Sequence, residues 1–237
     1  MREKEIALVT GTNKGLGREI ARRLAAMGMT VLATARDEPR GRSAVAELAA
    51  GGAEVRFAVL DVTDTDSAAA VARRIGAEYG RLDVLVNNAG VAAGAGHTAE
   101  EMRRLYETNV FGVVTVTNAL LPLLRRAPTA RIVNMSSTMG SLALHAGPNS
   151  PGLDLSHLAY SSSKTALNAV TLLYANHLRA DRIKVNAVCP GYVATDLNQH
   201  SGIRTVEQGA EIAVRLATLD TDGPTGTFVD DNGAVAW

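Results

Sequence analysis

Cysteine, aromatic residues and net charge are all scarce in this sequence of 237 residues. Its single cysteine, Cys189, excludes an intramolecular disulfide and a metal site built from several thiolates. There are 24 Lys and Arg residues against 24 Asp and Glu residues, a balance that argues against electrostatic capture of nucleic acid or of an acidic membrane. The five histidines show no metal-ligand spacing. We therefore expect no bound metal, no nucleic-acid partner and no membrane partner.

The chain also lacks an apolar run that would predict a membrane span or a secretory signal. The apolar run near the N-terminus, 6–10, is too short for the core of a signal peptide. The longest uncharged stretch, 132–153, is interrupted by Asn, Pro, Gly, His and Ser residues. The length fits one α/β domain, so we expect a single domain over 1–237 in a soluble, cytoplasmic protein.

Short apolar runs alternate with longer segments of helical periodicity. The runs are rich in Val, Ile and Leu without strict polar alternation, which is typical of strands covered on both faces. The predicted strands are 6–10, 30–35, 55–60, 84–87, 131–136, 184–188 and 227–229. The predicted helices are 16–27, 41–50, 65–79, 98–126, 157–179 and 205–218. This alternation predicts an α/β fold with a parallel sheet between two layers of helices.

A glycine-rich segment follows directly after the first predicted strand and runs from Thr10 to Gly17 with the spacing G-x-x-x-G-x-G. Glycines there allow a tight turn and the close approach of backbone N–H groups to a pyrophosphate at a helix N-terminus. A turn without a ligand remains an alternative for the spacing alone, and the position on the first strand favours a dinucleotide. The candidate contacts are Gly11, Asn13, Lys14, Gly15, Leu16 and Gly17.

Three further motifs follow this loop in order, over almost the entire chain. They are Asn87-Asn88-Ala89-Gly90, Tyr160-x-x-x-Lys164 and Pro190-Gly191. Together with the glycine loop they resemble the short-chain dehydrogenase/reductase family, and carbonyl-reductase-like members in particular. The resemblance implies a Rossmann-type, doubly wound parallel sheet of about seven strands in a single domain, with oxidoreductase activity.

Tyr160 and Lys164 stand four residues apart and share one face of a predicted helix. A tyrosine normally has a pKa near 10, and a neighbouring ammonium would favour the phenolate and bring proton transfer closer to neutral pH. The resemblance adds a bond from Lys164 to the nicotinamide ribose. It also implies that Ser137 holds the substrate oxygen and that Asn109 holds a water in a proton relay to Lys164. Ser136 would then point to the opposite side of the strand and cap the turn.

The end of the second predicted strand bears on the choice of cofactor. NAD-binding relatives place an acidic residue there, whereas this chain has Ala35 followed by Arg36. A guanidinium binds a 2′-phosphate bidentately, and Lys14 adds a second cation, so we expect NADP(H). We interpret the neighbouring Asp37 as the cap of the next helix, with Pro39 in its first turn.

The resemblance implies the remaining cofactor contacts. Asp61 and Val62 follow the third predicted strand, at the position of the family's adenine contact. The other implied contacts are Asn88, Ala89, Gly90, Tyr160, Lys164, Pro190, Gly191, Val193 and Thr195.

The irregular segment 140–156 lies between Ser137 and Tyr160 and is expected to border the substrate. Its leucines, Leu142, Leu144 and Leu153, would line the pocket or pack locally. Because the segment is longer than in typical family members, it would also influence assembly: a homo-oligomer, dimer or tetramer, with a monomer as the alternative.

The motifs together predict transfer of a hydride between NADP(H) and a small-molecule carbonyl or alcohol, most readily the reduction of an aldehyde or ketone. An NAD-dependent alcohol dehydrogenase is one alternative. A non-catalytic, dinucleotide-sensing binding protein of the same fold is the other, since a fold alone does not fix a function. The presence of all four catalytic residue types favours an enzyme.

Overall fold

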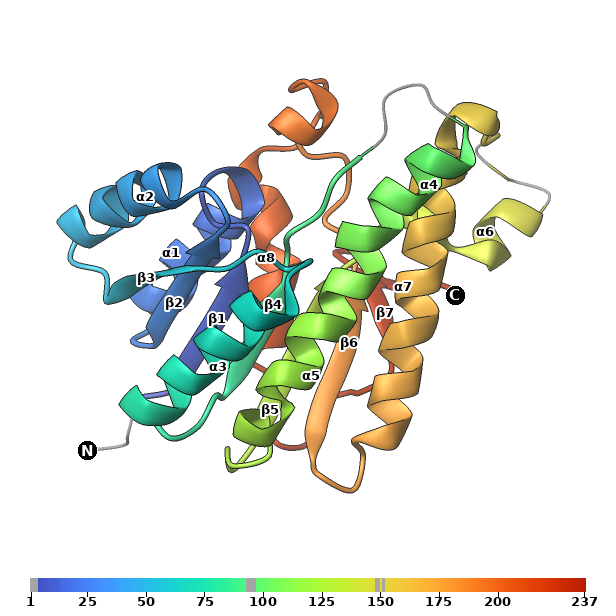
Figure 1. The fold of residues 1–237 in the computed structure, drawn as a ribbon. Helices are drawn as coiled ribbons and strands as arrows, with labels where there is room; N and C mark the ends of the chain where they lie inside the picture. Colours follow the sequence, from blue (N-terminus) through green and yellow to red (C-terminus); the bar gives the residue numbers. More distant parts are fainter. Residues whose placement is uncertain (1–3, 93–96, 148–149, 151) are drawn as a thin grey trace.

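Residues 4–92, 97–147, 150 and 152–237 are described in the computed structural model. Within these residues, one sheet of eight strands has the order β3-β2-β1-β4-β5-β6-β7-β8 (Figure 1). The strands are β1 (Ile6–Thr10), β2 (Thr30–Ala35), β3 (Val55–Val59), β4 (Val84–Asn87), β5 (Ala130–Met135), β6 (Ile183–Val188), β7 (Phe228–Asp230) and β8 (Gly233–Ala234). Strands β1 to β7 are parallel, and β8 pairs antiparallel with β7.

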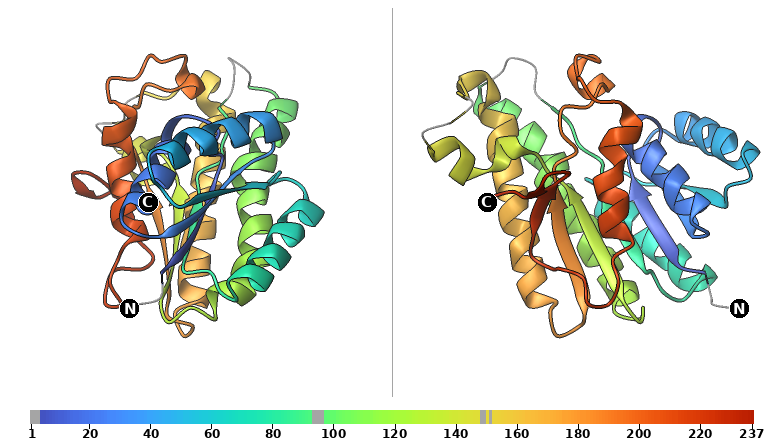
Figure 2. Two further views of the ribbon diagram at one scale, coloured as in Figure 1. Left: turned by 90° about the vertical axis from the view of Figure 1, so that its left-hand side faces the viewer. Right: turned by 180° about the vertical axis from the view of Figure 1, so that it is seen from behind.

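Helices cover both faces of the sheet, as Figures 1 and 2 show from opposite sides. Helices α3, α5 and α7 lie on one face, while α1 and α8 pack together on the other. The helices are α1 (Gly15–Ala26), α2 (Glu38–Ala50), α3 (Thr65–Glu78), α4 (Ala99–Tyr106), α5 (Gly112–Leu124), α6 (Leu142–Ala146), α7 (Leu158–His177) and α8 (Val206–Ala217). The predicted doubly wound α/β fold is therefore confirmed.

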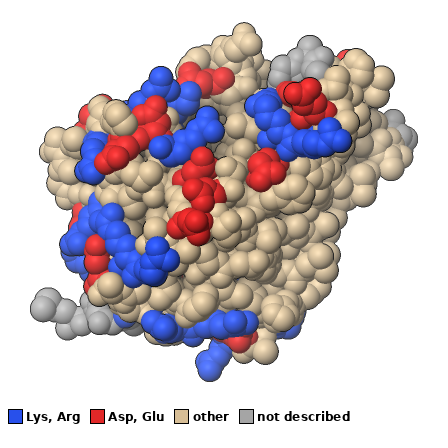
Figure 3. All heavy atoms as spheres, viewed as in Figure 1, with Lys and Arg blue, Asp and Glu red and all other residues tan. Residues whose placement is uncertain are grey.

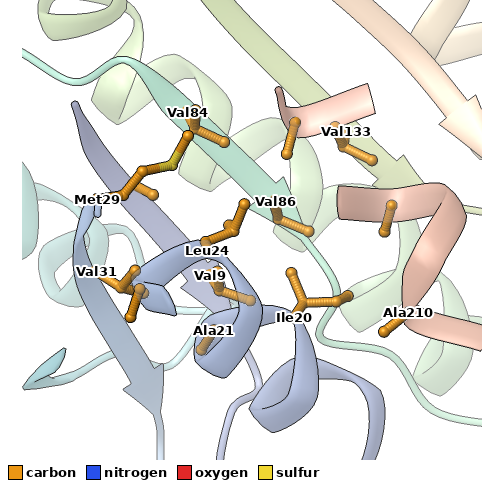
Figure 4. Packing of buried hydrophobic residues seen from close by; sticks show 14 of the residues in the cluster. Val9, Ile20, Ala21, Leu24, Met29, Val31, Val84, Val86, Val133 and Ala210 are labelled. Carbon is orange, nitrogen blue, oxygen red and sulfur yellow. The ribbon is translucent and has the colours of Figure 1, made fainter. Parts of the chain in front are cut away.

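Hydrophobic side chains fill two separate layers because successive residues of a strand point to opposite faces. Val9 and Val31 belong to the cluster under α1 and α8, shown in Figure 4. Leu8 and Leu32, one residue away, belong to the cluster under α3 and α5. Since both faces are buried, the strands read as nearly continuous apolar runs.

The predicted strands all form, each with bounds within one residue of the prediction. The eighth strand was not predicted, because two residues are too few to show a periodicity. The helix predicted at 41–50 begins earlier, at Glu38. Asp37 caps it as expected, since its carboxylate accepts a hydrogen bond from the Arg40 backbone N–H at 3.0 Å.

Two further predictions need correction. The helix predicted at 98–126 is divided by a π-helical segment, Glu107–Phe111, between α4 and α5. The segment predicted as irregular, 140–156, contains α6 and the 3₁₀ turn Leu155–His157. Five residues of α6 are too short for a helical period to be recognised, and Pro148 and Pro151 lie outside the described residues.

The run 99–124 is the described helical stretch that is long and apolar enough, by length and composition, to cross a membrane. Half of its most apolar window is buried, with α4 against α7 and α5 against α3, as in a core helix. Figure 3 shows charges of both signs over much of this side of the molecule and a broad surface without charge over α5 and α7. Helix α5 contains no charged residue, and Phe111, Leu172 and Leu173 are exposed beside it or on α7. We refer to this surface as the uncharged face.

Candidate active site

A cavity of about 570 Å³ opens at the carboxyl ends of the parallel strands. Strand order reverses there between β1 and β4, the usual place for a ligand in a doubly wound sheet. The predicted site residues that line the cavity are Gly11, Asn13, Lys14, Gly15, Leu16, Gly17, Arg36, Asp61, Val62, Asn88, Ala89, Gly90, Tyr160, Lys164, Pro190 and Thr195. The fold thus brings together most of the residues that the motifs single out.

Two predicted cofactor contacts, Gly191 and Val193, are not among the described residues that line this cavity. Val193 is buried, and its side chain packs against Gly209 at the start of α8. The backbone carbonyl of Val193 accepts a hydrogen bond from the Asn198 side chain at 2.9 Å. The side chain of Val193 therefore supports α8 and does not form part of the cavity wall.

The glycine loop has the shape that a dinucleotide phosphate requires. Gly11 and Gly15 have φ angles of +69° and +57°, a conformation that side chains rarely adopt. A Cβ on Gly17 would lie 2.4 Å from the Gly11 carbonyl oxygen, so α1 can approach the loop only with glycine there. Helix α1 has no side-chain cap and no acidic residue in its first turn, which leaves its N-terminal N–H groups for an anion.

Lys14, Arg36 and Arg40 supply positive charge at the nucleotide end of the cavity, and Arg40 is paired with Asp37 at 3.4 Å. Arg36 follows β2, is exposed, and forms no ion pair with any of the described residues. Lys14 does have a partner: its Nζ lies 2.6 Å from Oδ2 of Asp196, whose other oxygen lies 2.8 Å from Nε2 of His200. Nothing in the sequence pattern indicated that Asp196 would meet the glycine loop.

The structure places Tyr160 and Lys164 on the same face of α7. Nζ of Lys164 donates a hydrogen bond to the Met135 carbonyl oxygen at 2.8 Å and lies 5.6 Å from the centre of the Tyr160 ring. Burial, reinforced by Cys189 and opposed by a hydrogen bond with Ser137, raises the pKa of Tyr160 to about 12. Burial also lowers the pKa of Lys164 to about 8.

The expectation that Lys164 brings the pKa of Tyr160 down is therefore not met in this structure. The ammonium lies over the ring and is bonded to Met135, so burial dominates the pKa of the hydroxyl. Tyr160 is accordingly protonated at neutral pH.

Ser137 and Ser136 have different surroundings at the end of β5. The Ser137 hydroxyl interacts with the Tyr160 hydroxyl and accepts a hydrogen bond from the Met139 backbone N–H at 3.2 Å. The Ser136 hydroxyl is buried and donates to Oδ1 of Asn168 at 2.5 Å. Ser136 borders the cavity, whereas Ser137 is not among the described residues that line it, but the Ser136 hydroxyl is used by its bond to Asn168 on α7. The geometry thus favours Ser137 as the serine that faces a reacting group.

Asn109 lies in the π-helical segment, and its side chain forms hydrogen bonds with Val91 and Ser163. Oδ1 accepts from the Val91 backbone N–H at 2.9 Å. Nδ2 donates to the Val91 carbonyl at 2.9 Å and to the Ser163 hydroxyl at 3.1 Å. The side chain therefore joins the loop after β4 to α7. Because both N–H groups of the amide are used, a water bound at this residue would have to donate to one of its oxygens.

The leucines that were expected to line the pocket or to pack locally do not line this cavity. Leu142 and Leu144 are exposed, and neither they nor Leu153 are among the described residues that line the cavity. Helix α6 is attached to the chain end: the Ala143 backbone N–H donates to the Trp237 carbonyl at 2.9 Å. The cavity wall near the catalytic pair comes instead from residues that the sequence did not single out, including Val91, Met135 and Leu197.

Comparison with known proteins agrees with this fold. The family described as short chain dehydrogenase matches residues 5–204. Carbonyl reductase (NADPH) 3 of Mus musculus is 37% identical, with 98% of each chain covered. Short-chain dehydrogenase/reductase 1 of Saponaria officinalis is 36% identical, covering 97% of this chain and 95% of its own.

Solved structures give the same picture. An NADPH-bound carbonyl reductase from chicken fatty liver superposes with a TM-score of 0.85 at 30% identity and full coverage of both chains. Salutaridine reductase of Papaver somniferum superposes with a TM-score of 0.83 at 33% identity, covering 96% of this chain and 100% of its own. The chain belongs to the short-chain dehydrogenase/reductase family.

Proposed function

We propose that this protein is an NADP(H)-dependent oxidoreductase that reduces the carbonyl group of a small molecule, an aldehyde or a ketone. The observation that carries the proposal is that Tyr160, which lines the cavity together with the glycine loop, has its hydroxyl in contact with the hydroxyl of Ser137. The carbonyl reductases among the relatives support the same reaction. The NAD-dependent and the non-catalytic alternatives are less favoured.

NADP(H) fits the described residues. The uncapped N-terminus of α1 and the glycine loop would hold the pyrophosphate, and Arg36 with Lys14 would hold the 2′-phosphate. Lys164 would bind the ribose. The cofactor, when bound, supplies the hydride for the carbonyl carbon.

The chain's own residues handle the proton. Because Tyr160 is protonated at neutral pH, its hydroxyl can donate a proton to the substrate oxygen as negative charge develops there. Ser137 binds the same oxygen and stabilises that charge. Lys164, held by Met135, lies over the Tyr160 ring, and Asn109 holds the loop after β4 in place.

We expect Arg36→Ala to weaken NADPH binding by roughly ten- to a hundredfold and to change NADH binding little. A charge-assisted hydrogen bond is worth about 1.5–3 kcal/mol, and only NADPH carries the phosphate that would receive it. Titration of nicotinamide fluorescence gives both dissociation constants. Arg179→Ala, which removes an exposed arginine just beyond α7, is the control. Equal losses for the two cofactors, or tighter binding of NADH by the wild type, would contradict the assignment.

We also propose that the protein is a soluble, cytoplasmic homo-oligomer that associates through the uncharged face. Leu173 on this face is 68% exposed, an unfavourable position for a leucine in water. We expect Leu173→Glu to shift the molecule towards the monomer in sedimentation velocity runs. Met27→Glu, an equally apolar site after α1 on the other side of the sheet, should leave assembly unchanged. A wild type that sediments as a monomer at micromolar concentration would exclude this interface.

A further inference from the structure

One buried side chain, Asn168, holds both sides of the turn that carries Ser137. Its Oδ1 accepts the Ser136 hydroxyl at 2.5 Å, and its Nδ2 donates to the Gly140 carbonyl at 3.2 Å. Ser136 comes directly before Ser137, and Gly140 ends the 3₁₀ turn that follows it. Asn168 is 3% exposed, so both bonds are shielded from water.

The turn also packs directly on the helix that carries the catalytic pair. A Cβ on Gly140 would lie 2.6 Å from the backbone carbonyl carbon of Lys164, so only glycine permits this approach. The Gly140 carbonyl accepts a second hydrogen bond, from the Thr165 hydroxyl at 3.0 Å. Contacts on α7 thus fix the far end of the serine turn.

The same helix carries Tyr160, two turns before Asn168. A helix is stiff over this length, so the bonds made at Asn168 determine where Ser137 stands relative to the Tyr160 hydroxyl. The two hydroxyls must reach one substrate oxygen, and an error of about 1 Å in such an alignment can reduce a rate about a hundredfold.

We propose that Asn168 is a positioning residue of the active site: it clamps the serine turn to α7 and so aligns Ser137 with Tyr160. The inference rests on the proposed function. An amide suits this position because it accepts from a hydroxyl and donates to a carbonyl at once. A leucine would leave both of these buried partners unsatisfied, and an aspartate would turn an oxygen towards the Gly140 carbonyl.

The test is a double-mutant cycle between Asn168 and Ser137 in carbonyl reduction with NADPH. We expect Asn168→Ala to lower kcat about ten- to a hundredfold and to leave the Kd for NADPH within about twofold, because Asn168 does not line the cavity. In a Ser137→Ala background the same change should lower kcat less than about twofold further, because Asn168 acts through Ser137. If the two substitutions lowered kcat independently, so that their effects multiplied in the double variant, the proposal would be overturned.

Asn186→Ala is the matched control for loss of a buried asparagine. Asn186 lies on β6, is 1% exposed, and bonds Pro224 and Thr227 away from the serine turn. This variant should lose thermal stability and keep its kcat. An equal loss of kcat in the two asparagine variants would contradict a positioning role.

Ser136→Ala removes only one of the two bonds, so it remains informative if Asn168→Ala fails to fold. We expect a loss of kcat of about three- to tenfold, again absent in the Ser137→Ala background, and a wild-type value would overturn the proposal. A wild type that binds NADPH and reduces no carbonyl in a broad panel would instead overturn the proposed function, so the two failures are distinguishable.

Discussion

Replacement of Tyr160 by phenylalanine is expected to reduce turnover about 10²- to 10⁴-fold, the range that a general acid contributes. Only the hydroxyl is lost, so the ring still packs beneath Lys164, whose Nζ lies 5.6 Å from the ring centre. We therefore expect the Kd for NADPH and the melting temperature to stay near wild-type values. Initial rates of NADPH oxidation with a confirmed carbonyl substrate provide the measurement.

Tyr106→Phe is a suitable control for this change. Tyr106 ends α4, packs edge-on against Phe111, and is not among the described residues that line the cavity. Its loss of a hydroxyl should leave kcat unchanged. Substantial turnover by the Tyr160→Phe enzyme would refute Tyr160 as the proton donor.

The second large effect is expected for Lys164→Met, which should lower kcat about a hundredfold or more and also weaken NADPH binding. The methionine keeps the bulk of the side chain but loses the charge and the bond to Met135. The loss of NADPH affinity together with the loss of kcat distinguishes this variant from Tyr160→Phe, which should lower kcat alone. If kcat fell while the affinity for NADPH stayed unchanged, the assignment of Lys164 to the ribose of the cofactor would be refuted.

The pKa of Lys164 also gives the reaction a pH dependence. Burial lowers this pKa to about 8, so the ammonium is present below pH 8 and is lost as the pH rises through that value. Wild-type kcat/KM for reduction should fall above about pH 8, and that fall should be absent in Lys164→Met. Lys184→Met, on β6 and outside the cavity wall, should keep the wild-type profile.

The strands could be predicted from the sequence because burial on both faces makes them continuous apolar runs. The glycine loop could be predicted because Gly11 and Gly15 adopt a backbone that only glycine tolerates well. Helix α6 could not be predicted, since it is held by contacts with Trp237 rather than by its own periodicity. The predicted lowering of the Tyr160 pKa was wrong, since burial by the folded chain outweighs a charge four residues away in the sequence.

The same limit explains the missed contacts around Ser137. Asn168 looks like an ordinary polar residue in an amphipathic helix until the end of β5 is placed beside it. Side-chain pairs between distant segments are set by the tertiary fold, and the local pattern carries no trace of them.

Lys14 is already paired with Asp196, so a cofactor phosphate that binds Lys14 would have to displace this carboxylate. The free energy that Lys14 contributes to cofactor binding is therefore the difference between its interaction with the phosphate and its interaction with Asp196. His200, whose Nε2 lies 2.8 Å from Oδ1 of Asp196, would remain as a partner of that carboxylate. Thr195 and Leu197, on either side of Asp196, border the same cavity, so the Lys14–Asp196 ion pair joins this part of the cavity wall to the glycine loop.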